Sequence, residues 1–138
     1  MTNHLFDGLL PPDRDPSRPM LIAKDGSVAT TYGQARDRTG QYAQALASLG
    51  VKPGDRVLVQ VEKSAEALLL YLAVIRNGAI FLPLNTAYTV SELEYFIQDA
   101  EPKVIVCSPL RLDSIREVAR VPGVAIETMD ADGSGSLR

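Results

Sequence analysis

Four short apolar runs recur along the later part of the chain, and longer stretches of mixed polarity separate them. Between the runs, apolar side chains return every three or four positions, which indicates amphipathic helices. Strands that alternate with helices of this length predict right-handed crossover connections and a parallel sheet. The unbroken apolar runs agree, because parallel strands are buried on both faces. We expect the four strands at residues 56–61, 79–83, 103–107 and 124–128.

Hydroxyl side chains stand at the expected starts of the helices. Thr31 and Ser64 can each cap the helix that follows, since a side-chain oxygen at this position accepts a hydrogen bond from the first helical turn. Ser91 has Glu94 three residues further on, which is the spacing of a capping box. The last helix is expected over about residues 112–120.

The two ends of the chain lack this regular pattern. Residues 7–19 contain four prolines and are expected to be irregular. The Asp25-Gly26 pair between two short apolar runs predicts a hairpin, because it favours the positive φ angles of a tight turn. Residues 131–138 are polar and rich in glycine and serine, which is typical of a flexible linker or tail. The predicted fold is therefore α/β, a three-layer, Rossmann-like parallel sheet with flanking helices, preceded by a β-hairpin, within residues 1–130.

Composition is that of a soluble globular protein: 46% of the 138 residues are hydrophobic and 22% are charged. The net charge of -3 argues against nucleic acid as the main partner, because a phosphate backbone requires clustered lysines and arginines. Cys107 is the only cysteine, so no disulfide can form within the chain. The N-terminus has no signal-peptide pattern, and no stretch reaches about 18 apolar residues, the length of a membrane span. We therefore expect a cytoplasmic protein.

The residue types that usually carry catalysis form no set in this chain. His4 is the only histidine and is expected to be solvent-exposed in an irregular N-terminus. Cys107 ends an apolar run, which indicates a buried and inert thiol. The tail lacks the Gly-Lys-Ser/Thr of a phosphate loop, and the junction after the first predicted strand has no glycine that would let a dinucleotide approach. We expect no catalytic residue and no metal ligand here.

Polar residues directly follow three of the predicted strands. In an open parallel sheet, ligands bind beyond the carboxyl ends of the strands, so these residues lie at a suitable edge. Polar loops after strands are also the general rule, and the pattern leaves open a plain strand exit and a ligand-binding edge. The residues concerned are 62–63, 85–86 and 108–109.

A series of motifs between residues 54 and 106 carries a family resemblance. It opens with Gly-Asp-Arg-Val, continues through Asn-Gly-Ala, Pro-Leu and Ser-Glu-Leu, and closes with Ala-Glu-Pro-Lys before Val-Ile-Val. In this order the motifs resemble the N-terminal region of acyl-CoA synthetases, the adenylate-forming ligases. The version at residues 62–89, EKSAEALLLYLAVIRNGAIFLPLNTAYT, is most similar to the malonyl-CoA synthetase subfamily. The closing Asp-Gly-x-Gly-Ser-Leu at residues 132–137 also fits that subfamily.

The resemblance implies a ligase that joins a carboxylate to ATP, which forms an acyl-adenylate and pyrophosphate, and then passes the acyl group to the thiol of CoA. Mg²⁺ would assist the first step by neutralising phosphate charge. For the malonyl-CoA synthetase subfamily the carboxylate is malonate, and the reaction belongs to fatty acid metabolism.

The chain departs from this family in what it leaves out. The family's Ser/Thr/Gly-rich phosphate loop with its lysine, its adenine- and ribose-binding residues and its mobile C-terminal domain do not occur here. The resemblance therefore implies that residues 1–130 are the N-terminal subdomain of the large adenylation domain and that this chain alone is inactive. We expect an exposed apolar patch that faces the rest of the enzyme or causes self-association. The residues also leave open a free-standing, non-catalytic α/β binding module.

One binding residue follows from the resemblance. In relatives similar to acetyl-CoA synthetase, the loop after the Val-Ile-Val strand bears arginines near the CoA phosphates, and the matching loop offers Arg111. A guanidinium group suits phosphate because it donates hydrogen bonds in a planar fork. The alternative is that Arg111 is an exposed residue at the start of a helix.

Overall fold

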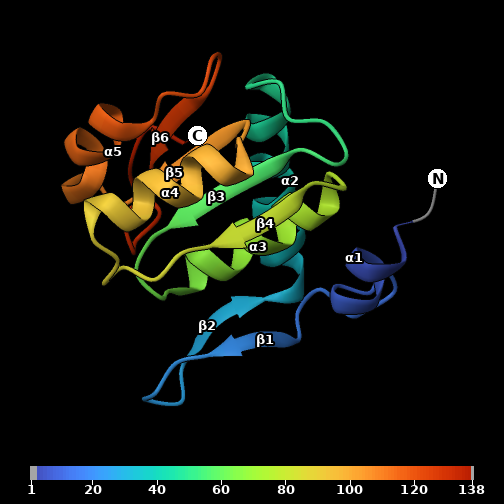
Figure 1. The fold of residues 1–138 in the computed structure, drawn as a ribbon. Helices are drawn as coiled ribbons and strands as arrows, with labels where there is room; N and C mark the ends of the chain where they lie inside the picture. Colours follow the sequence, from blue (N-terminus) through green and yellow to red (C-terminus); the bar gives the residue numbers. More distant parts are fainter. Residues whose placement is uncertain (1–2, 138) are drawn as a thin grey trace.

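The computed structural model describes residues 3–137, which form one layered unit with a small hairpin at its side (Figure 1). A parallel sheet forms the centre, and its strands alternate with helices along the chain. The elements are α1 (His4–Leu9), β1 (Pro19–Ile22), β2 (Val28–Thr31), α2 (Tyr32–Ser48), β3 (Arg56–Gln60), α3 (Ala65–Arg76), β4 (Ile80–Pro83), α4 (Val90–Ala100), β5 (Val104–Cys107), the 3₁₀ helix η1 (Pro109–Arg111), α5 (Leu112–Val118) and β6 (Ala125–Thr128).

All four strands of the main sheet are parallel and lie in the order β4-β3-β5-β6. Each lies within one residue of the bounds that the apolar runs predict. Val57 of the central strand β3 pairs with Phe81 on one side and with Val104 on the other. The predicted parallel α/β sheet is therefore confirmed.

Helices cover both faces of the sheet, as Figure 1 shows. Val57 and Val59 of β3 belong to a buried cluster with α2 and α3, in which Leu70 is fully buried. Leu58, between them in sequence, belongs to a second cluster with α4 and α5, in which Ile97 is fully buried. Successive side chains of a strand point to opposite faces, so one strand supplies both cores. The predicted three-layer arrangement is confirmed.

The N-terminal region contains more structure than its proline-rich sequence indicates. β1 and β2 pair antiparallel around a turn in which Gly26 has a φ of 86°, so the predicted hairpin is present. The short helix α1 was not expected. Its cap residue Asn3 accepts a hydrogen bond from the backbone N–H of Phe6 and donates one to the carbonyl of Ile75 at 2.7 Å. α1 is therefore stabilised by α3, a contact distant in sequence.

Helix starts follow the capping predictions with one exception. Thr31 caps α2 and Ser64 caps α3, each by accepting a hydrogen bond from a backbone N–H three residues on. The prediction for α4 is wrong: its capping box consists of Thr89 and Glu92, two residues earlier than Ser91 and Glu94. The sequence Thr-Val-Ser-Glu-Leu-Glu contains both overlapping patterns. Among residues 3–137, no helix has the length and apolar character needed to cross a membrane.

The C-terminal segment folds back along β6. The backbone N–H of Leu137 donates to the carbonyl of Thr128 at 3.1 Å, and the N–H of Ser136 donates to the Thr128 hydroxyl at 3.0 Å. The side chain of Leu137 is only 2% exposed. Residues 131–137 therefore differ from the flexible tail that their polar composition predicts, because one apolar side chain anchors them in the core.

Candidate functional site

The carboxyl ends of β3, β4 and β5 lie at one edge of the sheet, because the three strands are parallel and in register. Gln60 ends β3, Pro83 ends β4 and Cys107 ends β5. The loops that leave this edge are those that the sequence marks as a strand exit or a ligand-binding edge.

The loop after β4 is fastened to the central strand. Gln60 is fully buried, and its Nε2 donates a hydrogen bond to the backbone carbonyl of Asn85 at 2.9 Å. The side chain of Asn85 accepts a hydrogen bond from the backbone N–H of Ala87 at 2.8 Å, which makes a local turn. The buried amide at the end of β3 thus anchors the loop that follows β4.

Arg111 joins this loop to the one after β5. It ends η1, is half-buried, and donates from Nη2 to the carbonyl of Thr86 at 2.7 Å. The alternative interpretation agrees in position, because Arg111 is the N-cap residue of α5, but Arg111 is half-buried rather than exposed. Within residues 3–137, Nη2 is the only Arg111 nitrogen with a side-chain hydrogen bond, so the rest of the fork is available to a ligand.

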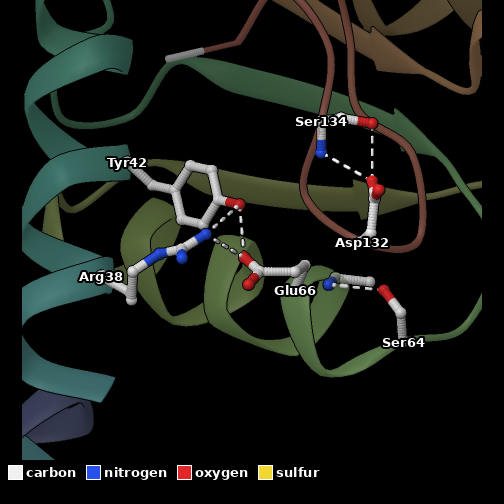
Figure 2. A network of polar contacts seen from close by, with 7 residues as sticks. Arg38, Tyr42, Ser64, Glu66, Asp132 and Ser134 are labelled. Carbon is white, nitrogen blue, oxygen red and sulfur yellow. Dashed lines mark hydrogen bonds and ion pairs between the residues drawn. The ribbon is translucent and has the colours of Figure 1, made fainter. Parts of the chain in front are cut away.

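A second polar cluster lies between α2 and α3, and it was not expected from the sequence (Figure 2). Arg38 Nη2 is 2.7 Å from Glu66 Oε2 and donates to the Tyr42 hydroxyl at 3.3 Å. Tyr42 in turn donates to Glu66 Oε2 at 2.5 Å. Burial raises the pKa of Tyr42, and the hydrogen bond to the Glu66 carboxylate raises it further. The three side chains thus provide one another with hydrogen-bond partners at the border of the core.

The C-terminal segment lies over this cluster, as Figure 2 shows for the loop that carries Asp132 and Ser134. Between them, Gly133 has a φ of 85°, and a Cβ there would lie 3.0 Å from Glu66 Cδ and 3.2 Å from Arg38 Nη2. Glycine is therefore required at this position both for its conformation and for the close approach. The C-terminal segment therefore packs closely against the Arg38–Glu66 ion pair at Gly133.

Cys107 is buried and His4 is exposed, as the sequence predicts, but His4 lies on a helix and not in an irregular segment. Cys107 is buried, and burial raises the pKa of its thiol to about 11, so the reactive thiolate is scarce at neutral pH. His4 is exposed on α1. Within residues 3–137, no group of three or more His, Cys, Asp or Glu side chains is arranged to hold a metal ion.

Comparison with known proteins gives a consistent family. The family model described as "AMP-binding enzyme" matches residues 11–136. The crystal structure of ATP-bound MatB from Rhodopseudomonas palustris superposes with a TM-score of 0.90 and 45% sequence identity over 99% of this chain. Oxalate--CoA ligase from Arabidopsis thaliana is 34% identical over 88 residues, 63% of this chain. Long-chain-fatty-acid--CoA ligase FadD13 from Mycobacterium tuberculosis is 30% identical over 109 residues, 76% of this chain.

All of these relatives are much longer than the matched region. The chain covers 27% of the MatB chain, 22% of FadD13 and 17% of the oxalate ligase. It therefore spans about a quarter or less of the length of the proteins it matches.

Proposed function

The chain belongs to the AMP-binding enzyme family, and from this premise we propose that it is the N-terminal part of an ATP-dependent acid–CoA ligase that makes malonyl-CoA. The enzyme would convert malonate, ATP and CoA into malonyl-CoA, AMP and pyrophosphate through an acyl-adenylate. The similarity to MatB, 45% over 99% of this chain, is the observation that carries the proposal.

Malonate as the acid rests on a narrower basis than the reaction type. The relatives include ligases named for oxalate and for long-chain fatty acids. Enzymes that share this region are therefore named for different acid substrates. The resemblance of residues 62–89 to the malonyl-CoA synthetase subfamily favours malonate among them. A cytoplasmic location agrees with the single, buried and unpaired Cys107.

Most of the groups that handle ATP and Mg²⁺ would lie outside these residues. The chain has no Gly-Lys-Ser/Thr phosphate loop, and residues 3–137 contain no metal-binding cluster, so they do not fit either group. Residues 1–130 would form the N-terminal subdomain of the large adenylation domain and residues 131–138 the segment that leaves it. ATP-binding and C-terminal domains would follow. The 138-residue chain would then be inactive alone, because nothing in it opposes the charge that develops on the pyrophosphate leaving group.

Arg111 is the one residue that we propose for binding, as a contact to a phosphate of CoA. Its half-buried guanidinium is held by the Thr86 carbonyl and keeps further N–H groups for a ligand. In the full-length enzyme, Arg111→Ala should raise KM for CoA about tenfold and leave KM for malonate unchanged, since one charge-assisted contact contributes about 1.5–3 kcal/mol. An unchanged KM for CoA, or an equal rise for both substrates, would contradict this role.

The experiment that tests the proposed function starts with the reading frame beyond Arg138. The encoded enzyme is expressed and assayed for ATP-dependent thioester formation with malonate, oxalate, acetate and a long-chain fatty acid as separate substrates. We expect the highest kcat/KM with malonate. Preference for another acid would contradict malonate as the substrate and leave the ligase reaction standing. A stop codon after Arg138, or no thioester with any acid, would overturn the ligase and favour the free-standing binding module.

A further inference from the structure

One face of α2 is not covered by the rest of the described chain. Residues at spacings of three and four form a stripe beside the buried face of the helix and line a groove of about 440 Å³. Gln41 and Ser48 are exposed at its rim, and half-buried Ala45 lies between them. The full lining is Arg38, Gln41, Tyr42, Gln44, Ala45 and Ser48.

The C-terminal segment leads the chain to this same face. Gly133 lies against Arg38, which lines the groove, and Leu137 is buried in the cluster that also contains Tyr42. Leu137 is the last described residue, and its side chain is 2% exposed. A polypeptide that continues from this point therefore starts beside α2.

The chemistry of the groove suits a peptide backbone. Its one charged lining residue, Arg38, is neutralised by Glu66 at 2.7 Å, so the groove does not select for an anion. The glutamines and Ser48 are uncharged, and each can both donate and accept hydrogen bonds. Such side chains match the alternating N–H and C=O groups of an irregular segment.

We infer that this face of α2 is the docking surface for the polypeptide that follows residue 138 in the full-length ligase, with Gln41, Gln44 and Ser48 as its contacts. The inference rests on the proposed function, which supplies that continuation. The chain covers 27% of the MatB chain, so a full-length ligase of similar size would supply a large segment to pack against it. The anchored segment at residues 131–137 would set where that segment begins.

Cysteine labelling tests the surface without requiring the remainder to fold alone. Ser48→Cys is introduced both in the 138-residue chain and in the full-length enzyme, and its alkylation rate is read on the tryptic peptide by mass spectrometry. Ser91→Cys on α4 is the matched control, since Ser91 is also an exposed serine on a helix. Native Cys107 is buried and stays largely unlabelled. We expect labelling at position 48 to slow at least about tenfold in the full-length enzyme and labelling at position 91 to change less than about twofold.

A second pair guards against a local effect of one substitution. Gln41→Cys should be protected like Ser48→Cys, and Gln98→Cys, an exposed glutamine on α4, should not. Equal labelling of positions 41 and 48 in the short and long proteins, or equal protection of both helices, would overturn the inference while an active ligase would leave the proposed function standing. A reading frame that stops at Arg138 would overturn the proposed function first.

Discussion

β5 and β4 have similar apolar sequences but very different surroundings. All four residues of β5, Val-Ile-Val-Cys, are fully buried, with β3 and β6 on its two sides. β4, Ile-Phe-Leu-Pro, is an edge strand that pairs only with β3, and its Ile80 is 51% exposed. An apolar run thus predicts a strand of a parallel sheet, but it does not reveal whether the cover that such a strand needs is present.

The β4 edge has no further strand partner among residues 3–137, as expected if the chain is part of the proposed larger enzyme. Ile80 on β4 is 51% exposed, and Leu68 on α3 is 37% exposed. Pro83 limits the edge, because it has no N–H to offer to another strand. β4 therefore presents an exposed apolar side chain, Ile80, that the remainder of the proposed ligase would cover.

The largest predicted effect separates the two strands directly. Ile105→Ala in β5 should lower the free energy of unfolding by about 4 kcal/mol, because it leaves a cavity in a closely packed core. Ile80→Ala in β4 should cost less than about 1 kcal/mol in the isolated chain, since half of the side chain is already in water. Urea unfolding of the two variants measures the difference. Equal losses would show that the edge is covered, for example by a second copy.

A slightly smaller effect is expected at the C-terminal segment. Gly135 has a φ of 135°, and a Cβ there would lie 2.3 Å from the carbonyl oxygen of Thr128, so Gly135→Ala should cost about 3 kcal/mol. Gly26 has a φ of 86° with nothing near its would-be Cβ, and Gly26→Ala should cost only about 1 kcal/mol. Thermal unfolding compares them. If Gly135→Ala left the thermal stability unchanged, residues 131–137 would be a flexible tail rather than an anchored segment.

The end of β5 should confer a pH dependence that β4 lacks. Burial raises the pKa of Cys107 from 9.0 to about 11, so the folded chain keeps a proton that the unfolded chain loses in this range. The contribution of the thiol to stability is complete below pH 9 and is lost as the pH rises to 11, at up to about 1.4 kcal/mol per pH unit. Relative to Cys107→Ala, the wild type should therefore lose stability above pH 9, and Tyr42 cancels because both proteins contain it. A difference independent of pH would contradict the buried thiol.

The smallest effect concerns association. If the isolated chain self-associates through the β4 edge, Ile80→Lys should reduce the apparent mass in light scattering at high concentration. It should also weaken the binding of a hydrophobic dye. Ile22→Lys on the hairpin, where Ile22 is 65% exposed, is the matched control and should change neither signal as much. A strict monomer without dye binding in the wild type would argue against an uncovered interface.

Sequence reasoning succeeds where the determinants are local. The parallel strands follow from continuous apolar runs, and the starts of α2 and α3 follow from Thr31 and Ser64, each of which caps its helix three residues away. Even local signals become ambiguous when they overlap, as at α4, where Thr89 and Ser91 both have a glutamate three residues on.

What the sequence does not predict depends on contacts between distant residues. α1 relies on the bond from Asn3 to the carbonyl of Ile75, 72 residues away. The cluster in Figure 2 joins Arg38 to Glu66 across 28 positions, and no spacing rule connects a helix residue with one on the next helix. The bond from Arg111 to the Thr86 carbonyl likewise links two loops that only the parallel register brings together.

The most direct test of the account is release of AMP from ATP in the presence of malonate and CoA. It is measured for the purified 138-residue chain and for the enzyme encoded by the full reading frame, at equal concentrations. We predict no malonate-dependent AMP from the chain alone, because these 138 residues contain no lysine-bearing phosphate loop, and sustained release from the proposed full-length enzyme. Malonate- and CoA-dependent AMP release by the 138 residues alone would contradict the proposal that they are one part of a larger ligase.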